Sequence, residues 1–428
     1  MDNATGSPRD AASVLFDLPG YRVVSAVDLP GGGREVVIAS VEGEAGCPTC
    51  GVLSGRVHQR TRQRLRDVPV AGHVRVVLIR RRFACVEQRC PRRTFAEVTG
   101  QVPARARTTA RLREQLLTAV LAGRSVAEVA ASYGVSWWTV QAVLNAAALL
   151  GIDPDAASPR RLGIDEHRYR SVRYWRDEHG TWRRYEPWMS TIVDVDTGGV
   201  LGVVDGRGAA GVAAWLAARP QEWRDRIEVV AIDPSAAFRA ALRDQLPQAA
   251  VSVDAFHLVK LANDTLTRVR QRLTRQTKGR RGRGIDPVWT NRRLLLRAGD
   301  TLSPAGLARL RATFTADDPT QEIAAAWAVK ERLRHLLHAT TLTDLDHRRD
   351  LFTDAVTAAA MPETDRLAAT ITTWWPAIEV LVITGVTNAR TEAANTTIKQ
   401  IKRTGRGYRN PHHYKTRILL ASAARTAA

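Results

Sequence analysis

Two kinds of hydrophobic periodicity divide the chain. After an irregular start, residues 21–42 contain two apolar runs of strand length, whereas residues 106–150 repeat apolar side chains at helical spacing. Strand-length runs return from residue 161, in the order strand, hairpin, helix, strand, helix, strand. Mostly helical residues, 263–385, then interrupt this alternation before a final helix that starts near residue 386. The alternating part predicts a ribonuclease-H-like core, a mixed sheet flanked by helices with functional side chains at strand ends.

The first helical stretch contains a helix-turn-helix pattern, SVAEVAASYGVSWWTVQAVLNAA. Ala130 is small where two helices would cross, Gly134 permits a tight turn, and Ser136 is placed to cap the second helix. An ordinary helical hairpin is the alternative for this pattern. The positions of the second helix that we expect to face outward, toward a DNA major groove, are Trp137, Trp138, Thr139 and Gln141.

The four cysteines of the chain form two close pairs. Cys47 and Cys50 are spaced C-x₂-C, and Cys85 and Cys90 are spaced C-x₄-C. A disulfide framework fits poorly in a large cytosolic chain, which leaves a metal site or unligated buried thiols. Because two pairs of thiolates close a tetrahedral Zn²⁺ site without an open position, we predict a structural zinc ion in a β-rich module.

Charge adds a class of partner to this picture. The formal net charge is +20 and the pI is near 10.8, which favours nucleic acid over a merely solvated or ribosome-bound arginine-rich surface. The sequence has no basic start followed by an apolar run, and no stretch of about 18 apolar residues. We therefore expect a cytoplasmic protein that uses no membrane and associates with the nucleoid when it is bound to DNA.

Three acidic residues stand out against this basic background. Asp165 lies on the first strand of the alternating region, Asp233 ends the apolar strand RIEVVAID, and Glu392 heads the final helix. At helical spacing, Glu392 aligns with Lys399 and Arg403, whereas the opposite side of the helix is apolar. We expect the helix to pack on that apolar side, which comprises Ala394, Ile398 and Ile401.

Carboxylates that converge from two strand ends and one helix suit a pair of divalent cations. Hard oxygen ligands are those of Mg²⁺, or of Mn²⁺ in its place, and two such ions support in-line displacement at phosphorus. Glu166 competes with Asp165 as a ligand, although alternation along a strand points it to the other face. Asp194 and Asp196 are interpreted as polar groups of a hairpin turn. The side chains of the final helix that we predict to bind DNA are Asn395, Lys399, Lys402 and Arg403.

The chain resembles the bacterial insertion-sequence transposases of the ISL-three group, which belong to the DDE class. The resemblance covers nearly the whole chain. It implies that Asp165, Asp233 and Glu392 form the catalytic triad. It also implies that Asp254 and His257, in DAFH, are neighbours of the active site, although a core-facing histidine is the alternative for His257. The stretches that carry it are CPTCG…RRFACVEQRCPRRTFAE, LGIDEHRYR, VVAIDPSAAFRAALRDQLPQAAVSVDAFHLVK and RTEAANTTIKQIKRTGRGYRN.

Two features depart from the family pattern. Residues 168–188, which follow the first acid, are longer and more basic than the resemblance predicts. Ala393 follows the glutamate at a position where family members have glycine. Neither change removes an acid of the triad.

The resemblance implies a DNA transposase that binds the terminal inverted repeats of an insertion sequence and catalyses metal-dependent strand cleavage and strand transfer. Its partners would be double-stranded DNA, as element ends and as target, and another copy of the chain, because pairing two ends needs at least a dimer. The alternatives are a domesticated or inactive transposase that acts as a sequence-specific regulator, and a structure-specific nuclease. Retention of all three acids disfavours the regulator, and the helix-turn-helix with the long insertion disfavours the nuclease.

Together these features predict a multidomain α/β protein with a large all-helical insertion before the last catalytic helix. The insertion opens with a helix that runs into a basic loop, residues 268–283, whose arginines we expect to bind DNA of any sequence. The expected segments are an N-terminal segment (1–40), a zinc-binding module (41–105), a helix-turn-helix domain (106–150), a linker (151–161), the first part of the ribonuclease-H-like core (162–262), the helical insertion (263–385), and the last catalytic helix with the C-terminal tail (386–428).

Overall fold

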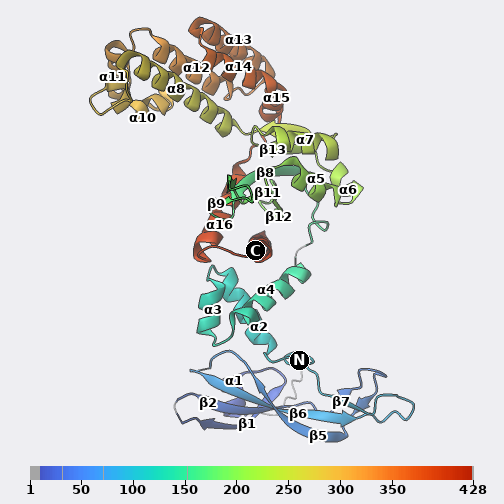
Figure 1. Ribbon diagram of the computed structural model, residues 1–428. Helices are drawn as coiled ribbons and strands as arrows, with labels where there is room; N and C mark the ends of the chain where they lie inside the picture. The colour runs from blue at the N-terminus through green and yellow to red at the C-terminus, as the bar shows by residue number, and fades with distance from the viewer. Residues whose placement is uncertain (1–9, 31, 71, 152, 427–428) are drawn as a thin grey trace, which may run out of the picture. The chain divides into compact units, whose positions relative to one another are not determined.

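The computed structural model of the protein describes residues 10–30, 32–70, 72–151 and 153–426. By its internal contacts the chain divides into two compact units (Figure 1). The first unit holds the chain up to Gly151 together with residues 404–406, and the second unit holds the rest. The β-rich region with the cysteines and the helix-turn-helix pattern therefore belong to the first unit, and the three acids belong to the second.

A five-stranded sheet forms much of the first unit. β2 and β6 run parallel, and the other neighbouring strands run antiparallel. Ile38, Val76 and Leu78 alternate toward its buried face, as the strand-length apolar runs predict. The strands follow the spatial order β1 (Tyr21–Asp28), β2 (Arg34–Ser40), β6 (Val74–Ala84) and β5 (Val57–Leu65), and β7 (Thr94–Ala96) pairs with β6.

Two smaller features of this unit lie outside that sheet. A short helix, α1 (Ala11–Phe16), occupies a segment predicted to be irregular, because the Asp10 carboxylate caps it by accepting a hydrogen bond from the Ser13 N–H. A two-stranded sheet, β3 (Ala45–Gly46) with β4 (Leu53–Ser54), brackets the first cysteine pair.

Three helices complete the first unit and confirm the helix-turn-helix prediction. The helix that precedes the turn begins with a capping box between Ser125 and Glu128. Gly134 adopts a φ of +60° in the turn, and Ser136 Oγ accepts from the Thr139 N–H at the start of the third helix. The helices are α2 (Ala110–Leu121), α3 (Val126–Ser132) and α4 (Trp137–Gly151).

The second unit is built on a mixed five-stranded sheet. The first three strands in its spatial order are antiparallel neighbours, and the last three are parallel neighbours. This order and these directions are those of a ribonuclease-H-like core, as predicted. The strands, in spatial order, are β12 (Val200–Asp205), β11 (Trp188–Asp194), β8 (Arg161–Arg168), β13 (Val229–Ile232) and β14 (Ala250–Val253).

Helices cover both faces of this sheet. On one face, Ile164, Ile192 and Ile232 form a common buried core with the helices that follow β12 and β13. On the other face, Met189 packs with Ile398 of the last part of the chain. The predicted C-terminal tail is thus largely a second packed helix. The first face carries α5 (Ala209–Ala217), α6 (Gln221–Asp225) and α7 (Ala236–Gln245), and the second carries α16 (Ala389–Thr404) and α17 (Pro411–Thr426).

The all-helical insertion is continuous with the core rather than tethered to it. α8 starts immediately after β14 and runs unbroken through the expected boundary near residue 263. Leu333, Phe352 and Trp375 of the insertion belong to the same buried cluster as the sheet. Its elements are α8 (Ala255–Lys278), α9 (Pro287–Thr290), α10 (Arg292–Leu296), η1 (Gly299–Thr301), α11 (Pro304–Asp317), α12 (Glu322–Leu336), α13 (Leu342–Ala359), α14 (Pro362–Thr373) and α15 (Trp375–Thr384).

No single helix in the described part of the chain is long and apolar enough to cross a membrane. One pair of helices, α14 with α15, meets that criterion together by length and composition alone, and it is bent by 60°.

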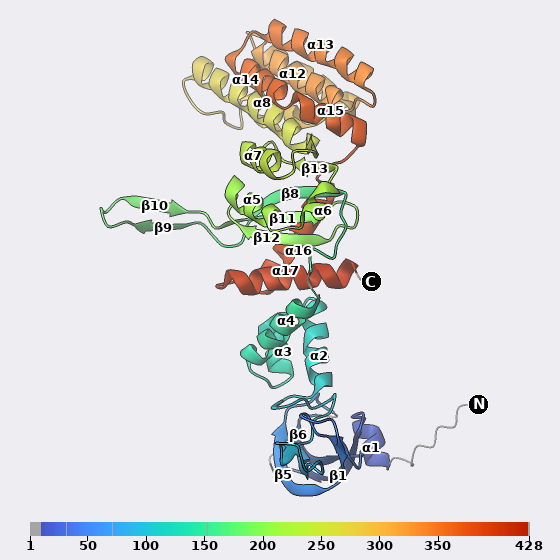
Figure 2. The ribbon, with the colours of Figure 1, turned by 90° about the vertical axis from the view of Figure 1, so that its right-hand side faces the viewer.

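Between β8 and β11 the chain forms a separate two-stranded ribbon, β9 (Arg173–Arg176) with β10 (Trp182–Tyr185). Figure 2 shows the ribbon extending away from the five-stranded sheet of the second unit. This ribbon is the structure adopted by the long basic stretch that departs from the family pattern.

Candidate active site and nucleic-acid interface

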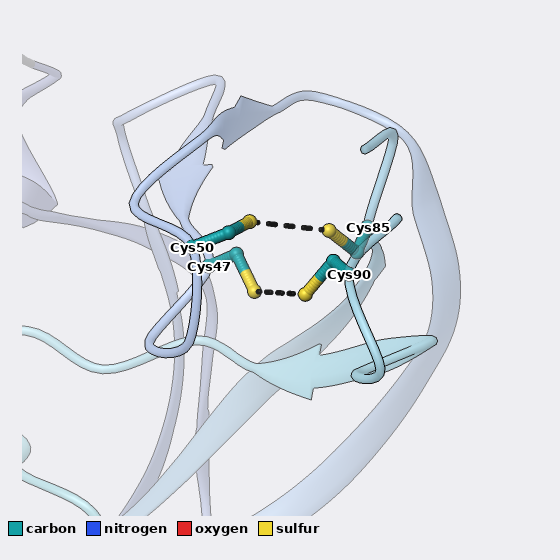
Figure 3. Close-up of side chains that lie close together, drawn as sticks. All are labelled: Cys47, Cys50, Cys85 and Cys90. Carbon is teal, nitrogen blue, oxygen red and sulfur yellow. Dashed lines mark hydrogen bonds between the residues drawn. The ribbon is translucent and has the colours of Figure 1, made fainter. Parts of the chain in front are cut away.

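The four cysteines converge in the first unit, as predicted. Cys47 Sγ lies 3.9 Å from Cys90 Sγ, and Cys50 Sγ lies 3.6 Å from Cys85 Sγ (Figure 3). All four sulfur atoms lie within 4.8 Å of one another, and none forms a disulfide. A tetrahedron with metal–sulfur bonds of about 2.3 Å requires sulfur–sulfur distances of about 3.8 Å. The thiols are therefore already spaced for a tetrahedral metal ion.

The local chain around Cys47 favours its thiolate. Burial of Cys47 opposes ionisation, but hydrogen bonds from the backbone N–H groups of Cys50 and Thr49 outweigh it and lower the pKa of the Cys47 thiol to about 6. Phe83 and Phe95 stack beside the cluster and complete a small apolar core. The four cysteines therefore lie in a part of the first unit where few other hydrophobic side chains are buried together.

On α4, two of the four positions that were predicted to face outward are exposed. Trp138 is 70% exposed, Trp137 is exposed, and Thr139 is half-buried. The predicted outward orientation of Gln141 is wrong: its side chain is buried and donates to Asn145 Oδ1. Gln141 follows the core residue Val140, so the same side of the helix buries both.

Three carboxylates line up at one edge of the sheet in the second unit. In the parallel register Ile164 pairs with Ile232, and Ile232 pairs with Val253. The next residue in each strand is an aspartate: Asp165, Asp233 and Asp254. Because parallel strands end at the same edge, these three side chains are neighbours, although 89 residues of sequence span the set from 165 to 254.

Helix α16 crosses the same edge and brings the glutamate. Gly163 permits the close approach: a Cβ there would lie 2.0 Å from Thr391 Oγ1 and 2.9 Å from Asn388 Oδ1. Asn388 Nδ2 donates to the Ile164 carbonyl and to Asp233 Oδ1, both at 3.3 Å. The helix is therefore anchored on two of the strands that carry acids, with Glu392 one residue beyond the contact.

A cavity of about 420 Å³ collects the acids. The distances qualify this convergence, because in the described residues Asp165, Asp233 and Glu392 do not form a set whose ligand atoms all lie within 4.8 Å of one another. The set that does so comprises Asp233, Asp254 and His257. The residues that line the cavity are Asp165, Glu166, Trp188, Asp233, Phe256, His257, Glu392, Asn395, Thr396 and Lys399.

The prediction that strand alternation points Glu166 to the opposite face from Asp165 is wrong. Glu166 lines the same cavity as Asp165 rather than lying away from it. β13 pairs with β8 only as far as Ile164, so β8 runs past the end of its neighbour and the cavity extends around that free end. Burial raises the pKa of Glu166, and the charge of Asp165 adds to the rise.

His257 faces the acids and not the hydrophobic core. Its Nδ1 lies 2.7 Å from Asp254 Oδ2, and its Nε2 lies 3.0 Å from Asp233 Oδ2. The hydrogen bond with Asp254 raises the pKa of His257. Burial raises the pKa of Asp233 to about 7, with a further contribution from the Asp165 charge, while His257 opposes the rise. Repulsion among carboxylates in a partly buried cavity is what a cation would relieve.

Asn395 has a different place from the predicted one. It is buried, its Nδ2 donates to Asp165 Oδ2 at 2.6 Å, and its Oδ1 accepts from Thr191 Oγ1 at 3.2 Å. His167 Nδ1 lies 3.1 Å from the same Thr191 oxygen, and burial lowers the pKa of His167 to about 4, which keeps it neutral. Asn395 therefore holds Asp165 in place from the wall of the same cavity.

The predicted cations of α16 remain at the surface to different degrees. Lys399 and Arg403 are exposed, and Lys399 borders the cavity. Lys402 is half-buried and donates to the Arg168 carbonyl. The apolar side of α16 is buried as predicted at Ala394 and Ile398.

The basic stretch that opens the insertion is partly structural. Buried Asp286 accepts from Lys278 at 3.0 Å and from Arg280 at 2.7 Å, and it ties the loop to the end of α8. Arg272 pairs with two glutamates, and Arg270 is buried. These four cations are therefore buried or held in ion pairs within the chain, and DNA binding by the arginines of this stretch stays a prediction. The exposed cations that remain are Arg268, Arg275, Arg281 and Arg283.

Asp194 and Asp196 are turn residues, as interpreted. Asp194 accepts from the Asp196 N–H and from Thr197 Oγ1, and Asp196 pairs with Arg161. The residues at the site that the sequence did not reveal are Trp188, Phe256 and Thr396, which line the cavity, and Asn388, which donates to Asp233. Asn388 lies one residue before α16. It anchors that helix from outside the helical repeat, so the spacing of apolar and polar residues could not indicate its role.

Comparisons with known proteins identify the family of the chain. Residues 162–418 match a family described as transposase, residues 91–148 match the helix-turn-helix domain of transposase family ISL3, and residues 44–90 match the zinc-finger of transposases IS204, IS1001, IS1096 and IS1165. The transposase for insertion sequence element IS1001 of Bordetella parapertussis is 26% identical over 386 residues, which cover 88% of each chain. A solved Drosophila P element transposase strand transfer complex aligns with a TM-score of 0.41 and 9% identity, over 73% of this chain and 92% of that one. The chain belongs to the ISL3 family of DNA transposases.

Proposed function

We propose that this transposase cuts and rejoins DNA strands at the cavity bordered by Asp165, Asp233 and Glu392. One observation carries the proposal. The parallel register of β8 and β13 sets the two aspartates side by side, and α16 delivers the glutamate to the same cavity. These are the three acids on which the resemblance places the triad.

The donor set fits hard divalent cations. Four carboxylates, including Glu166, face the cavity against two cationic side chains, His257 and Lys399. Burial raises the pKa values of Asp233 and Glu166, and the negative charge of Asp165 adds to both rises. Two Mg²⁺ or Mn²⁺ ions held by the triad would activate the attacking oxygen and stabilise the leaving oxygen of the phosphodiester.

The surrounding residues keep the ligands in position. Asp165 is fixed by Asn395 and by the Glu166 N–H, which donates to its Oδ1 at 2.7 Å. Asn388 orients Asp233. His257, oriented by Asp254 through its Nδ1, holds Asp233 through its Nε2 at the cavity wall. Lys399 supplies a second positive charge there.

Glu392 is the mobile member of the triad in this proposal. Its side chain is exposed, whereas Asp165 and Asp233 are half-buried; neither Glu392 nor Asp165 belongs to the close set of ligand atoms around Asp233. Entry of cations and DNA would draw it inward, since carboxylates on both sides of the ions are then needed to balance charge. Catalytic assembly would thus depend on substrate.

The first unit would recognise the element ends. Its four cysteines are spaced for a structural Zn²⁺ ion, and the exposed side of α4 presents Trp137, Trp138 and Thr139 to DNA. Pairing the two ends of one element, followed by joining to target DNA, requires at least two copies of the chain.

The test is strand transfer from a pre-cleaved element end, with DNA that carries the inverted repeats flanking the gene, in the presence of Mg²⁺. Asp233→Ala and Glu392→Ala should abolish strand transfer but retain DNA binding. Asp244→Ala, an exposed acid on α7, serves as the matched control and should act as wild type. Equal activity of the triad variants and the control would contradict the assignment. A wild-type protein that binds the repeats and never transfers strands would favour the regulator.

A further inference from the structure

The β9–β10 ribbon is exposed on both faces. All eight of its residues are exposed, and they are only arginine, tyrosine and tryptophan. Large aromatic side chains are costly to leave in water, and an isolated two-stranded ribbon is at best marginally stable. Tyr174 and Trp182 are each 62% exposed, and Trp175 and Tyr185 are each 47% exposed. The side chains of this ribbon therefore bury no surface in the hydrophobic core of their own chain.

The register gives each face the same composition. Directly opposite residues share a face, so Trp182, Arg176, Tyr174 and Arg184 form one face. Arg183, Trp175, Tyr185 and Arg173 form the other. Each face thus presents two aromatic rings and two guanidinium groups. The Trp175 and Tyr185 rings meet edge to face at 6.3 Å on one side, and Arg176 lies 5.1 Å over the Trp182 ring on the other.

The acids beside the ribbon are already used. Asp177 pairs with Arg183 at 2.6 Å and accepts backbone hydrogen bonds in the tip turn. Glu186 pairs with Arg184 at the base. Within the described residues, no carboxylate lies at ion-pair distance from Arg173 or Arg176. Each face therefore keeps one arginine that is available to an anion.

The base of the ribbon is a wall of the active-site cavity. Trp188, the first residue of β11 and the third after the ribbon, lines the cavity together with Asp165 and Glu166. Arg168 and Arg207 lie over its ring at 4.7 and 4.9 Å. Glu186 at the base is paired with Arg168 and Arg184, so a polyanion that runs from the cavity along the ribbon would meet arginines and aromatic surface.

We infer that the β9–β10 ribbon is a DNA-binding element that holds the strand next to the scissile phosphate. Arg173 and Arg176 neutralise phosphates, and the exposed rings stack on bases that lose their partners when the duplex opens at the cleavage site. The positive charge of both faces disfavours a second ribbon or another basic surface as the occupant. This inference rests on the proposed function, and it adds a surface that the triad and the helix-turn-helix do not supply.

The experiment measures binding of the full-length protein to two fluorescent probes as a function of salt. One probe is a duplex of the inverted repeat with its flanking DNA, and the other is the same duplex with the bases beside the scissile phosphate unpaired. The variants are Arg173→Ala/Arg176→Ala and Trp175→Ala/Trp182→Ala. The matched control is Arg226→Ala/Arg243→Ala, which removes two exposed arginines from the helical cover of the same unit.

The arginine variant should bind both probes more weakly and should reduce the slope of log K against log salt by about 1.8, that is, by about 0.9 for each lost phosphate contact. The aromatic variant should keep the slope and should lose affinity chiefly for the unpaired probe, by roughly 5- to 150-fold for each stacked base. The control should keep both quantities, which separates a local contact from a loss of total charge.

Three outcomes would overturn the inference while the proposed function stands. In the first, the ribbon variants bind DNA and transfer strands like wild type. In the second, the control lowers the salt slope as much as the arginine variant does. In the third, the ribbon variants lose self-association while each protomer binds DNA normally. The last would make a second copy the occupant. A wild-type protein that does not transfer strands at all would instead refute the proposed function.

Discussion

Replacing Gly163 with alanine tests how the fold brings the acids together. Gly163 lies two residues before Asp165 on the same face of β8, directly under the first turn of α16. The new Cβ would lie 2.0 Å from Thr391 Oγ1, whereas Cβ contacts in proteins essentially never fall under 3.0 Å. Thr391 and Asn388 are completely buried, so neither can move aside freely. The helix and the strand must separate by about 1 Å.

The expected effect on activity is larger than the effect on stability. Overpacking a buried contact costs about 1–3 kcal/mol, and in a unit of this size this cost lowers Tm by a few degrees. A shift of about 1 Å between catalytic groups costs on the order of 10²-fold in rate. Since Glu392 adjoins the clash and Asp165 lies beyond it, we expect Gly163→Ala to fold and to lose about that much strand transfer.

Two further variants separate displacement from general damage. Gly202→Ala makes a comparable clash, 2.5 Å from the Trp215 ring, on the other face of the sheet and away from the acids. It should lower Tm and leave the strand-transfer rate of the folded protein unchanged. Thr391→Ala in the Gly163→Ala background removes the 2.0 Å contact and should restore much of the activity. The reasoning fails if folded Gly163→Ala transfers strands like wild type, or if the double variant is no more active than the single one.

Three other outcomes are expected. Cys47→Ser should release the bound zinc, measured by metal analysis of the purified protein, and should lower the Tm of the first unit; unchanged zinc content would contradict the site. Because the folded-state pKa of Asp233 is raised to about 7 from about 3.9 in an unfolded chain, this carboxyl should lower stability as pH rises through that window. Mg²⁺ should therefore raise Tm more at pH 8 than at pH 5.5, and a shift that is the same at both values, or that survives in Asp233→Asn, would argue against this residue. Arg275→Ala/Arg281→Ala should weaken DNA binding at all sequences and lower its salt slope, whereas Arg272→Ala should lower stability with no change in slope; a sequence-selective loss in the first variant would show a different role.

The sequence was sufficient for the features that depend on local order. The carboxyl ends of paired parallel segments meet at one sheet edge, so Asp165 and Asp233, which each follow an apolar stretch of such a strand, could be expected near each other without coordinates. The two cysteine pairs and the turn at Gly134 likewise carry their geometry in their spacing. These are cases in which a few adjacent residues determine the structure.

The errors arise where a side chain lies at the border between two environments. Helical spacing gives the angle between Asn395 and Glu392, but it does not say how far the sheet reaches around the helix. Asn395 falls on the buried side of that border and binds Asp165, and Gln141 does the same beside Val140. Strand alternation gave the wrong face for Glu166 because β8 continues past the end of β13. Only the pairing register of the two strands shows this difference in length.

Ion pairs between distant segments were equally hidden. Arg272 meets its glutamates on α12 and α14, and no local pattern connects them. The β9–β10 ribbon was missed for a different reason. Neither of its faces packs on a core, so its strands lack the apolar–polar alternation that marks other strands.

The central claim is that Glu392 completes a metal-dependent site with Asp165 and Asp233. The most direct measurement is Mg²⁺-dependent strand transfer by Glu392→Gln, with DNA binding recorded on the same samples. The substitution keeps the size of the side chain and its place on α16, and it removes only the charge that a cation needs. The account predicts wild-type binding to the element end with strand transfer lost to background. Strand transfer by Glu392→Gln at the wild-type rate would contradict it.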